Sequence, residues 1–210
     1  YASAIIVEVD GLKQYVQFLG KGLVGVDAET GKFLWRYDRT AEGSPANIPT
    51  PLAHEGYVYS ATGRGGAALV EIQVNGKDVE TQEVYFSTRL PEGIGGAVRI
   101  GDDLYGSNDQ GMICADFTTG DIKWQDRAIG PCSVCYADGC LYLHSERSGE
   151  VALIEAAPEA YREKGRFTPP DPPKLGTGRG QPRSWAYPVV ANGRLYIRNW
   201  NRLWCYDIQE

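Results

Sequence analysis

A unit of about forty residues recurs along this 210-residue chain. Each copy carries a turn dipeptide followed by an apolar–Tyr–apolar run, and the five tyrosines are Tyr15, Tyr59, Tyr105, Tyr142 and Tyr196. The intervals between them are 44, 46, 37 and 54 residues. Within each unit apolar and polar residues alternate with period two, which is typical of β-strands. A repeat of this length restricts the fold to units that bury their faces against their neighbours.

Each unit reads as a four-stranded antiparallel meander. The pattern predicts an all-β chain, a β-propeller with about five blades, because a sheet this small must stack on neighbours around an axis. The approximate blades are 1–40, 46–90, 94–128, 131–168 and 184–210. For the fourth unit we expect the outer strand near 165–170, and residues 158–165 carry a weak helical pattern.

Two segments share a longer motif, "VDAETGKFLW" at 26–35 and "ADFTTGDIKW" at 115–124. The shared residues are Asp27, Thr30, Gly31 and Trp35 in the first segment, and Asp116, Thr119, Gly120 and Trp124 in the second. Glycine can take the positive φ of a tight turn, while Asp and Thr can accept hydrogen bonds from its free amides. The tryptophan then lies on the outer strand and can pack against the next blade. The motif therefore indicates architecture rather than chemistry.

This motif resembles the PQQ-like β-propeller family, which includes quinoprotein alcohol dehydrogenases and the lipoprotein subunit of the outer-membrane barrel assembly machine. Residues 14–39 are most similar to bacterial members of the planctomycete type. Segments 70–86 and 154–167 lack the Thr-Gly pair and the tryptophan, so only their strand pattern supports the resemblance. A WD40 propeller fits less well because its Trp-Asp and Gly-His signatures do not recur. The resemblance implies a ring of seven or eight blades and a periplasmic or exported protein.

The two ends of the chain do not complement each other as blades. The last unit ends at "LWCYDIQE", 203–210, without an outer strand, and residues 3–9 already read as an inner strand. A propeller that does not close leaves exposed sheet edges. We therefore expect the chain to be the C-terminal part of a longer protein whose preceding blades complete the ring. A self-closed five-bladed ring is the alternative.

Charge and cysteine content exclude several functions. A net charge of -6 and a pI near 5.1 argue against a nucleic-acid surface, which normally carries a basic stripe. No apolar run is long enough to span a bilayer, and residues 1–10 lack the features of a signal peptide. The five cysteines form an odd set. Cys132 and Cys135 make a CxxC pattern on a predicted strand, where they face opposite sides, so buried core cysteines are favoured over zinc ligands.

Strand parity predicts that short Asp-Gly, Asn-Gly and Thr-Gly turns lie on one face and the longer, varied loops on the other. Because function concentrates in loops on a rigid scaffold, the second face is the candidate ligand-binding face. Its candidate residues are Arg64, Asn108, Asp109, Arg147, Arg179, Arg183, Trp185 and Trp200. The loop 169–185 places arginines beside a tryptophan, which suits an anionic or sugar ligand, a protein partner, or only a solvated linker.

Two ligand patterns on this face are weak. Segments 61–66 and 176–180 are glycine-rich, but neither opens a helix that could hold a phosphate. Asn108 and Asp109 could hold calcium, yet one turn offers too few oxygens, and a plain β-turn is the better interpretation.

Two functions remain open. A quinoprotein dehydrogenase needs calcium, a carboxylate base and cationic residues for its cofactor. Such enzymes commonly add a disulfide between adjacent cysteines, and this chain has no adjacent pair. We assign no catalytic residue and no cofactor, and pyrroloquinoline quinone (PQQ) with calcium follows from the resemblance alone. The favoured hypothesis is a non-catalytic binding scaffold for a protein or polysaccharide, and the alternative is a PQQ-dependent dehydrogenase of alcohols or sugars.

Overall fold

The computed structural model describes residues 1–43, 46–76, 78–173 and 183–209, and this part of the chain is built from five antiparallel sheets. The first blade contains β1 (Ile5–Val9), β2 (Leu12–Leu19), β3 (Gly22–Asp27) and β4 (Phe33–Tyr37). The second contains β5 (Leu52–His54), β6 (Tyr57–Thr62), β7 (Gly66–Asn75) and β8 (Asp78–Ser87). The third contains β9 (Ala97–Ile100), β10 (Asp103–Ser107), β11 (Met112–Asp116) and β12 (Ile122–Asp126).

The fourth blade contains β13 (Cys132–Ala137), β14 (Cys140–Ser145), β15 (Val151–Glu155) and β16 (Glu163–Phe167). The fifth has three strands, β17 (Val189–Ala191), β18 (Arg194–Asn199) and β19 (Arg202–Asp207). A short 3-10 helix, η1 (Arg39–Ala41), follows β4. The weak helical pattern at 158–165 was misleading, and the outer strand expected at 165–170 is at 163–167 instead. Because strands pair through the backbone, β16 forms although all five of its residues are exposed.

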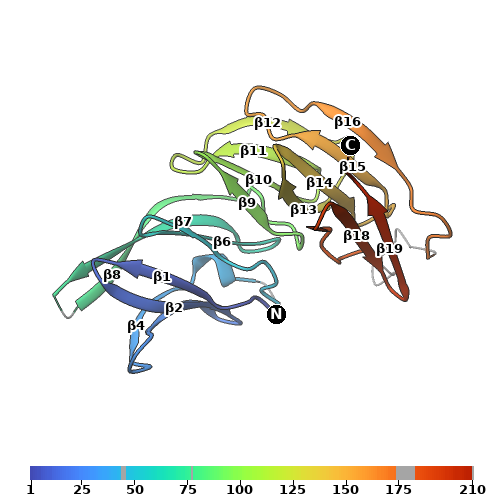
Figure 1. Cartoon of the computed structure of the whole chain (residues 1–210). Helices are drawn as coiled ribbons and strands as arrows, with labels where there is room; N and C mark the ends of the chain where they lie inside the picture. Colours follow the sequence, from blue (N-terminus) through green and yellow to red (C-terminus); the bar gives the residue numbers. More distant parts are fainter. Residues whose placement is uncertain (44–45, 77, 174–182, 210) are drawn as a thin grey trace.

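The sheets follow one another in chain order along an arc, with the first blade at one end and the fifth at the other (Figure 1). In each sheet the strands are adjacent in sequence order, which is the meander of a propeller blade. Neighbouring sheets contact through their inner strands, β1 with β5, β5 with β9, and β13 with β9 and β17. The chain therefore has the predicted β-propeller architecture, and the number of blades in the full ring stays a prediction.

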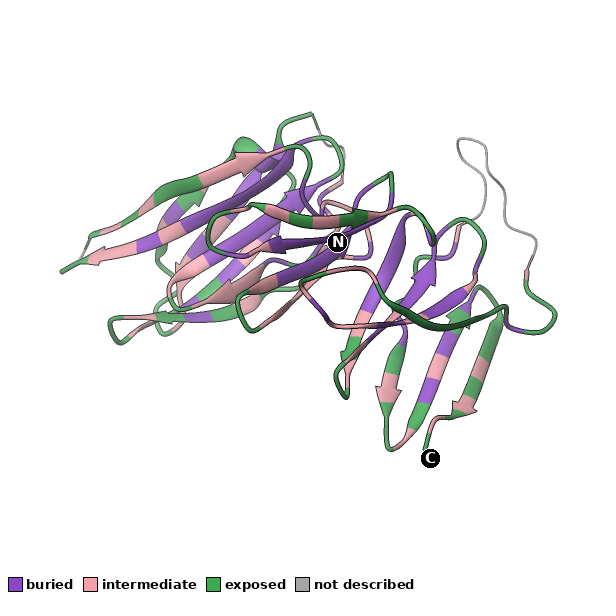
Figure 2. Cartoon of the chain, turned by 90° about the horizontal axis from the view of Figure 1, so that it is seen from above, coloured by how far each residue is buried: buried purple, intermediate pink, exposed green. Residues whose placement is uncertain are grey.

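The core is divided among the interfaces between blades. Val16, Trp35 and Val58 belong to a cluster that joins the first and second blades, and similar clusters join the second to the third and the third to the fourth. The fourth and fifth blades share a smaller cluster, with Val151, Leu195 and Ile197 as the buried members among the described residues. Figure 2 shows buried segments concentrated in the middle strands of the sheets. Each blade is thus stabilised chiefly by its neighbours.

The two motif turns share a hydrogen bond from the threonine backbone to the aspartate side chain. Asp27 Oδ1 accepts the backbone N–H of Thr30 at 2.7 Å, and Asp116 Oδ1 accepts that of Thr119 at 2.8 Å. The hydrogen bonds from the backbone N–H and the hydroxyl of Thr30 are the main reason that the pKa of Asp27 lies below its ordinary value. Gly31 and Gly120 follow with φ of 72° and 75°, conformations that side chains disfavour. The shared Asp and Gly thus form a tight reversal between the third and outer strands.

The two motif tryptophans have different polar partners. Trp35 is 3% exposed, packs over Gly25 and donates its indole N–H to Gln14 Oε1 of its own blade at 2.6 Å. Trp124 donates to the carbonyl oxygen of Ala157 in the fourth blade at 2.9 Å. Both rings belong to or pack against clusters that span two blades. The tryptophan is therefore part of the blade interface in both repeats.

The repeat tyrosines are not all equivalent. Tyr59 and Tyr105 are buried, whereas Tyr15 is 44% exposed. In β2 Val16 pairs with Gly25, and Gly25 pairs with Trp35 of the outer strand. Tyr15, one residue earlier, therefore points to the other side of the sheet. The prediction that Tyr15 is equivalent to the other repeat tyrosines is wrong, because a shift of one residue moves a side chain to the opposite face of a strand.

All five cysteines are free thiols. Cys114 and Cys132 are buried, Cys135 and Cys140 are half-buried, and Cys205 is exposed. The expectation of buried core cysteines at the CxxC pattern is confirmed for Cys132 and wrong for Cys135, which is only half-buried. Cys132 and Cys135 differ in burial as expected for residues three apart on one strand.

Candidate functional site

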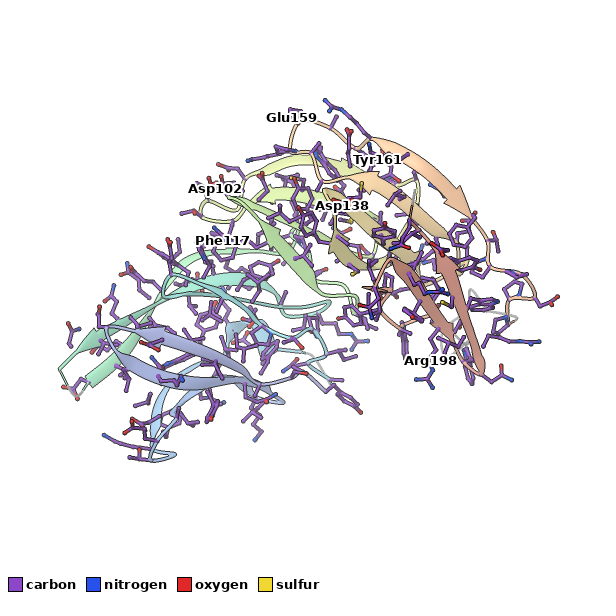
Figure 3. The ribbon with its side chains drawn as sticks, viewed as in Figure 1. Asp102, Phe117, Asp138, Glu159, Tyr161 and Arg198 are labelled. Atoms are coloured by element: carbon purple, nitrogen blue, oxygen red, sulfur yellow. The ribbon has the colours of Figure 1, made fainter. Side chains whose placement is uncertain are left out.

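The two ends of the blades carry different segments. We call the turn face the end formed by the first-to-second and third-to-outer strand turns, and the loop face the opposite end, which carries the second-to-third strand loops and the connections between blades. In Figure 3, Asp102, Phe117 and Tyr161, all from turn-face segments, lie in the upper part of the view, whereas Arg198, near the β18–β19 loop, lies below.

The loop face contains a hollow of about 220 Å³ that seven segments line together. Four are connections between blades, β4–β5, β8–β9, β12–β13 and β16–β17, and three are loops within blades, β6–β7, β10–β11 and β14–β15. Its charged lining residues are Glu92, Asp109, Glu146, Arg147 and Arg183. We call it the loop-face hollow. It lies where strand parity predicts the varied loops.

Four of the residues predicted from the sequence line this hollow: Asn108, Asp109, Arg147 and Arg183. Arg64 and Trp200 are exposed elsewhere on the surface and do not line it. Trp185 is 51% exposed and does not line the hollow, although its indole lowers the pKa of Glu146, which does. Arg179 lies outside the described residues. A ligand-binding role for these side chains stays a prediction.

Sequence reasoning missed two carboxylates, Glu92 and Glu146. Both occur in loops that were assigned to this face, within "PEGIGG" and "SERSG". The available signal was an acidic residue directly before Arg147 in one loop, but nothing in the pattern distinguishes a buried carboxylate from a solvated one. Their burial arises because loops from different blades converge on the hollow.

Asn108 supports the floor of the hollow. Its Oδ1 accepts the backbone N–H groups of Gln110 at 2.9 Å and Gly111 at 3.2 Å, and its Nδ2 donates to the carbonyl oxygen of Arg89 at 3.3 Å. The side chain is 6% exposed. Asn108 therefore holds the β10–β11 turn, as the β-turn interpretation requires, and its amide oxygen is already engaged.

Glu146 and its neighbours tie the fourth blade to the last connection. The backbone N–H of Glu146 donates to Pro131 O at 2.9 Å, and its carbonyl oxygen accepts the N–H of Ser184 at 3.0 Å. Burial raises the pKa of Glu146, while the nearby Arg183 guanidinium and the Trp185 indole favour the charged form. Arg183 thus lies near a carboxylate, that of Glu146, whose residue is only 6% exposed.

The opposite side of the hollow is acidic. Burial, together with the charge of Asp109, raises the pKa of Glu92 to about 7. Arg147, which also lines the hollow, donates from Nη2 to the carbonyl oxygen of Asp109 at 3.2 Å. The hollow therefore presents carboxylate acceptors and guanidinium donors together, with one carboxylate that gains a proton near neutral pH.

The described residues do not form a site that fits calcium beneath a quinone. Within 1–43, 46–76, 78–173 and 183–209 no group of three His, Cys, Asp or Glu side chains is placed to hold a metal ion. Asn108 Oδ1, the amide oxygen nearest Asp109 in sequence, already accepts two backbone N–H groups. We therefore derive no chemical step through PQQ and calcium. Nor does the described chain contain a helix with the length and apolar character of a membrane span.

Comparisons with known proteins agree with the fold. The family model described as outer membrane protein assembly factor BamB matches residues 2–160. Among solved structures, BamB from Moraxella catarrhalis superposes with a TM-score of 0.64 at 14% identity, covering 97% of this chain and 58% of that one. The Cps50 (Swd1) β-propeller domain of Myceliophteria thermophila gives 0.63 at 13% identity, covering 93% of this chain and 66% of that one.

No curated protein matches this sequence. The chain spans less than two thirds of the two solved structures above, and at such low identity they show the fold alone. The family model, in contrast, covers most of the chain, including both motif turns, the first three blades, and the first three strands of the fourth blade. The chain therefore belongs to the PQQ-like β-propeller family whose model is described by the outer membrane protein assembly factor BamB.

Proposed function

We propose that this chain is a non-catalytic binding scaffold that holds a polypeptide partner on its loop face. The observation that carries the proposal is the loop-face hollow, where loops from separate blades bring Glu92, Asp109, Glu146, Arg147 and Arg183 around one space. Such a mixture of fixed donors and acceptors suits a polypeptide, whose backbone and side chains offer both hydrogen-bonding types. The β-strands that carry these loops are held by the cores between blades, so the site is rigid at its base.

Family membership supports a scaffold role. The matching family is described as an outer membrane protein assembly factor, and assembly factors act by binding other proteins. The same membership supports a periplasmic or exported location, which fractionation of cells that express the full gene product would test. Recovery of the protein only with cytoplasmic markers would contradict that location.

Site-specific photo-crosslinking tests the binding proposal. A photoreactive amino acid replaces Asp109, which is exposed at the loop-face hollow, and in a matched control it replaces Glu29, exposed in the turn between β3 and β4 on the turn face. We expect a defined crosslinked polypeptide from position 109 and not from position 29. The charge-reversal variant Arg147→Glu should weaken that product, because it replaces a guanidinium donor of the hollow with a carboxylate, in a lining that already contains Glu92 and Glu146.

Other outcomes would replace the proposal. Equal crosslinking at both positions, or none at 109, would contradict a polypeptide site at the hollow. Binding of soluble oligosaccharides that depends on Arg183 would instead indicate a polysaccharide partner. A saturable quinone spectrum on titration with PQQ and calcium, followed by dye reduction on addition of alcohols or sugars, would indicate a dehydrogenase.

A further inference from the structure

The complete blades share one structural position on the outer strand, opposite a bulge in the third-to-outer pairing. In the first three blades this position holds an aromatic ring, and in the fourth it holds glycine. The equivalent pairs are Gly25 with Trp35, Leu69 with Tyr85, Cys114 with Trp124, and Leu153 with Gly165. The fourth blade therefore lacks the ring that the other three blades have.

In the second and third blades the ring also makes a hydrogen bond to the next blade. Tyr85 Oη donates to the carbonyl oxygen of Phe117 at 2.9 Å, and Trp124 Nε1 donates to that of Ala157 at 2.9 Å. Phe117 is the first residue after the third strand of its blade and Ala157 is the second, and Figure 3 labels Phe117. The ring thus fills apolar space between two blades and satisfies its polar atom on the far side.

At the fourth blade the corresponding space is empty. Gly165 is exposed, and no atom lies within 4 Å of where a Cβ on it would stand. A cavity of about 290 Å³ lies here between the fourth and fifth blades. Its apolar lining comes from Tyr142, Val151, Leu153 and Phe167 of the fourth blade and from Leu195 and Ile208 of the fifth. Arg166 also lines it, and its guanidinium is paired with Glu150 and Glu163. We call it the ring cavity.

The ring cavity also has the equivalent of the polar acceptor position. The backbone N–H of Phe117 donates to Asp102 O, and that of Ile208 donates to Gly193 O in the matching place of the fifth blade. Ile208 therefore stands where Phe117 stands in the third blade, and it lines the ring cavity. A ring that carries one N–H or O–H would find a backbone carbonyl where Tyr85 finds one.

We propose that the ring cavity binds one small neutral aromatic molecule of the indole or phenol class. Apolar cavities of about 150 Å³ already bind benzene, so the larger space here admits a bicyclic ring. Phe167 and Tyr206 join the two blades beside it with their ring centroids 4.8 Å apart. The ring cavity shares no lining residue with the loop-face hollow, so the two proposals are independent.

The test titrates the protein with free indole and follows binding by calorimetry and by methyl NMR. We expect a dissociation constant of about 1 mM or tighter, as good contacts allow for a ligand of this size. Ring-current shifts should occur at the methyl groups of Leu153, Leu195 and Ile208, while the methyl groups of Ile48 in the loop-face hollow should not move. 1-Methylindole, which lacks the N–H donor, should bind about five-fold more weakly.

Substitutions at Gly165 provide the matched comparison. Gly165→Trp supplies the missing ring from the protein itself, so it should abolish indole binding and raise the melting temperature, whereas Gly165→Ala leaves the space open and should keep binding. If Gly165→Trp does not fold, the methyl shifts of the unmodified protein decide alone. The proposal is overturned by unchanged methyl groups at saturating indole, by retained binding in a folded Gly165→Trp, or by binding of tryptophan-containing peptides without binding of free indole.

Discussion

The hydrogen bond between Trp35 and Gln14 allows a quantitative test of what stabilises the first blade. Gln14 is fully buried, and its Oε1 accepts the indole N–H of Trp35 at 2.6 Å. Among the described residues its Nε2 has no hydrogen-bond partner. Trp35→Phe would remove the donor and leave both polar atoms of the amide unsatisfied in the core.

The expected cost has two parts. Phenylalanine lacks three ring atoms of tryptophan, which at about 0.8 kcal/mol per buried carbon costs roughly 2 kcal/mol. An unsatisfied buried acceptor adds about 1–3 kcal/mol. We therefore expect Trp35→Phe to lower the free energy of unfolding by about 3–5 kcal/mol. Gln14→Leu removes the polar group, so in the double variant the acceptor penalty disappears and the coupling energy should be about 1–3 kcal/mol.

The assay is urea unfolding of the four proteins of this cycle, followed by far-ultraviolet circular dichroism because the substitution removes a fluorescent ring. Trp124→Phe is a useful comparison, since its indole is only partly buried and donates to a backbone carbonyl of the next blade. If the costs of Trp35→Phe and Gln14→Leu simply add, the buried amide does not depend on the indole and the reasoning is refuted.

Three further predictions concern turns, protonation and thiols. Gly31→Ala and Gly120→Ala both place a side chain at positive φ, and each should lower the free energy of unfolding by about 1–2 kcal/mol. Gly120→Ala should cost more, because its Cβ would meet the Tyr85 ring at 3.1 Å, whereas a Cβ on Gly31 has no neighbour within 4 Å. Equal unfolding midpoints of the two variants would contradict this reasoning. Because the pKa of Glu92 in the folded protein, about 7, exceeds its usual value of 4.5, the folded state binds more protons between these values and stability falls as pH rises through that window. Glu92→Gln should therefore stabilise the protein by about 1–2 kcal/mol at pH 8, because solvent partly screens this half-buried carboxylate, and by nothing below pH 4, as urea unfolding at both pH values can show. Burial raises the pKa of the Cys114 thiol to about 11 and that of Cys132 to about 12, so iodoacetamide should modify the exposed Cys205 in the native protein and these two only after unfolding, by mass spectrometry of digests.

The fold could be predicted from the sequence because its signals are local. Period-two alternation, Asp-Gly turns and the Asp–Thr–Gly–Trp spacing each depend on a few neighbouring residues, and strand parity then separates the turn face from the loop face. Tyr15 was assigned wrongly because an alternating pattern sets which residues share a face only after the pairing register is known. In the first blade the register is seen only from the pairing of Val16 with Gly25 and of Gly25 with Trp35, and both partners come later in the chain than Tyr15.

The candidate site was predictable only in part. Asn108, Asp109, Arg147 and Arg183 lie in loops that parity assigns to one face, so their loops could be identified without coordinates. The burial of Glu92 and Glu146 could not, because it arises where loops from different blades converge. The ring cavity was equally inaccessible, since Gly165 reads as an ordinary glycine until the pairing with Leu153 reveals which residue it replaces.

The last interface of the chain combines two of these observations. Blades of a propeller are stabilised by neighbour interfaces, so the size of each shared core sets how firmly the next blade is held. Among the described residues, the cluster between the fourth and fifth blades has three buried hydrophobic members, whereas that between the third and fourth has ten. The ring cavity lies in the smaller of these two interfaces. A ring bound there would add apolar contacts to both blades at once, and therefore ligand binding at the ring cavity would also stabilise the position of the fifth blade.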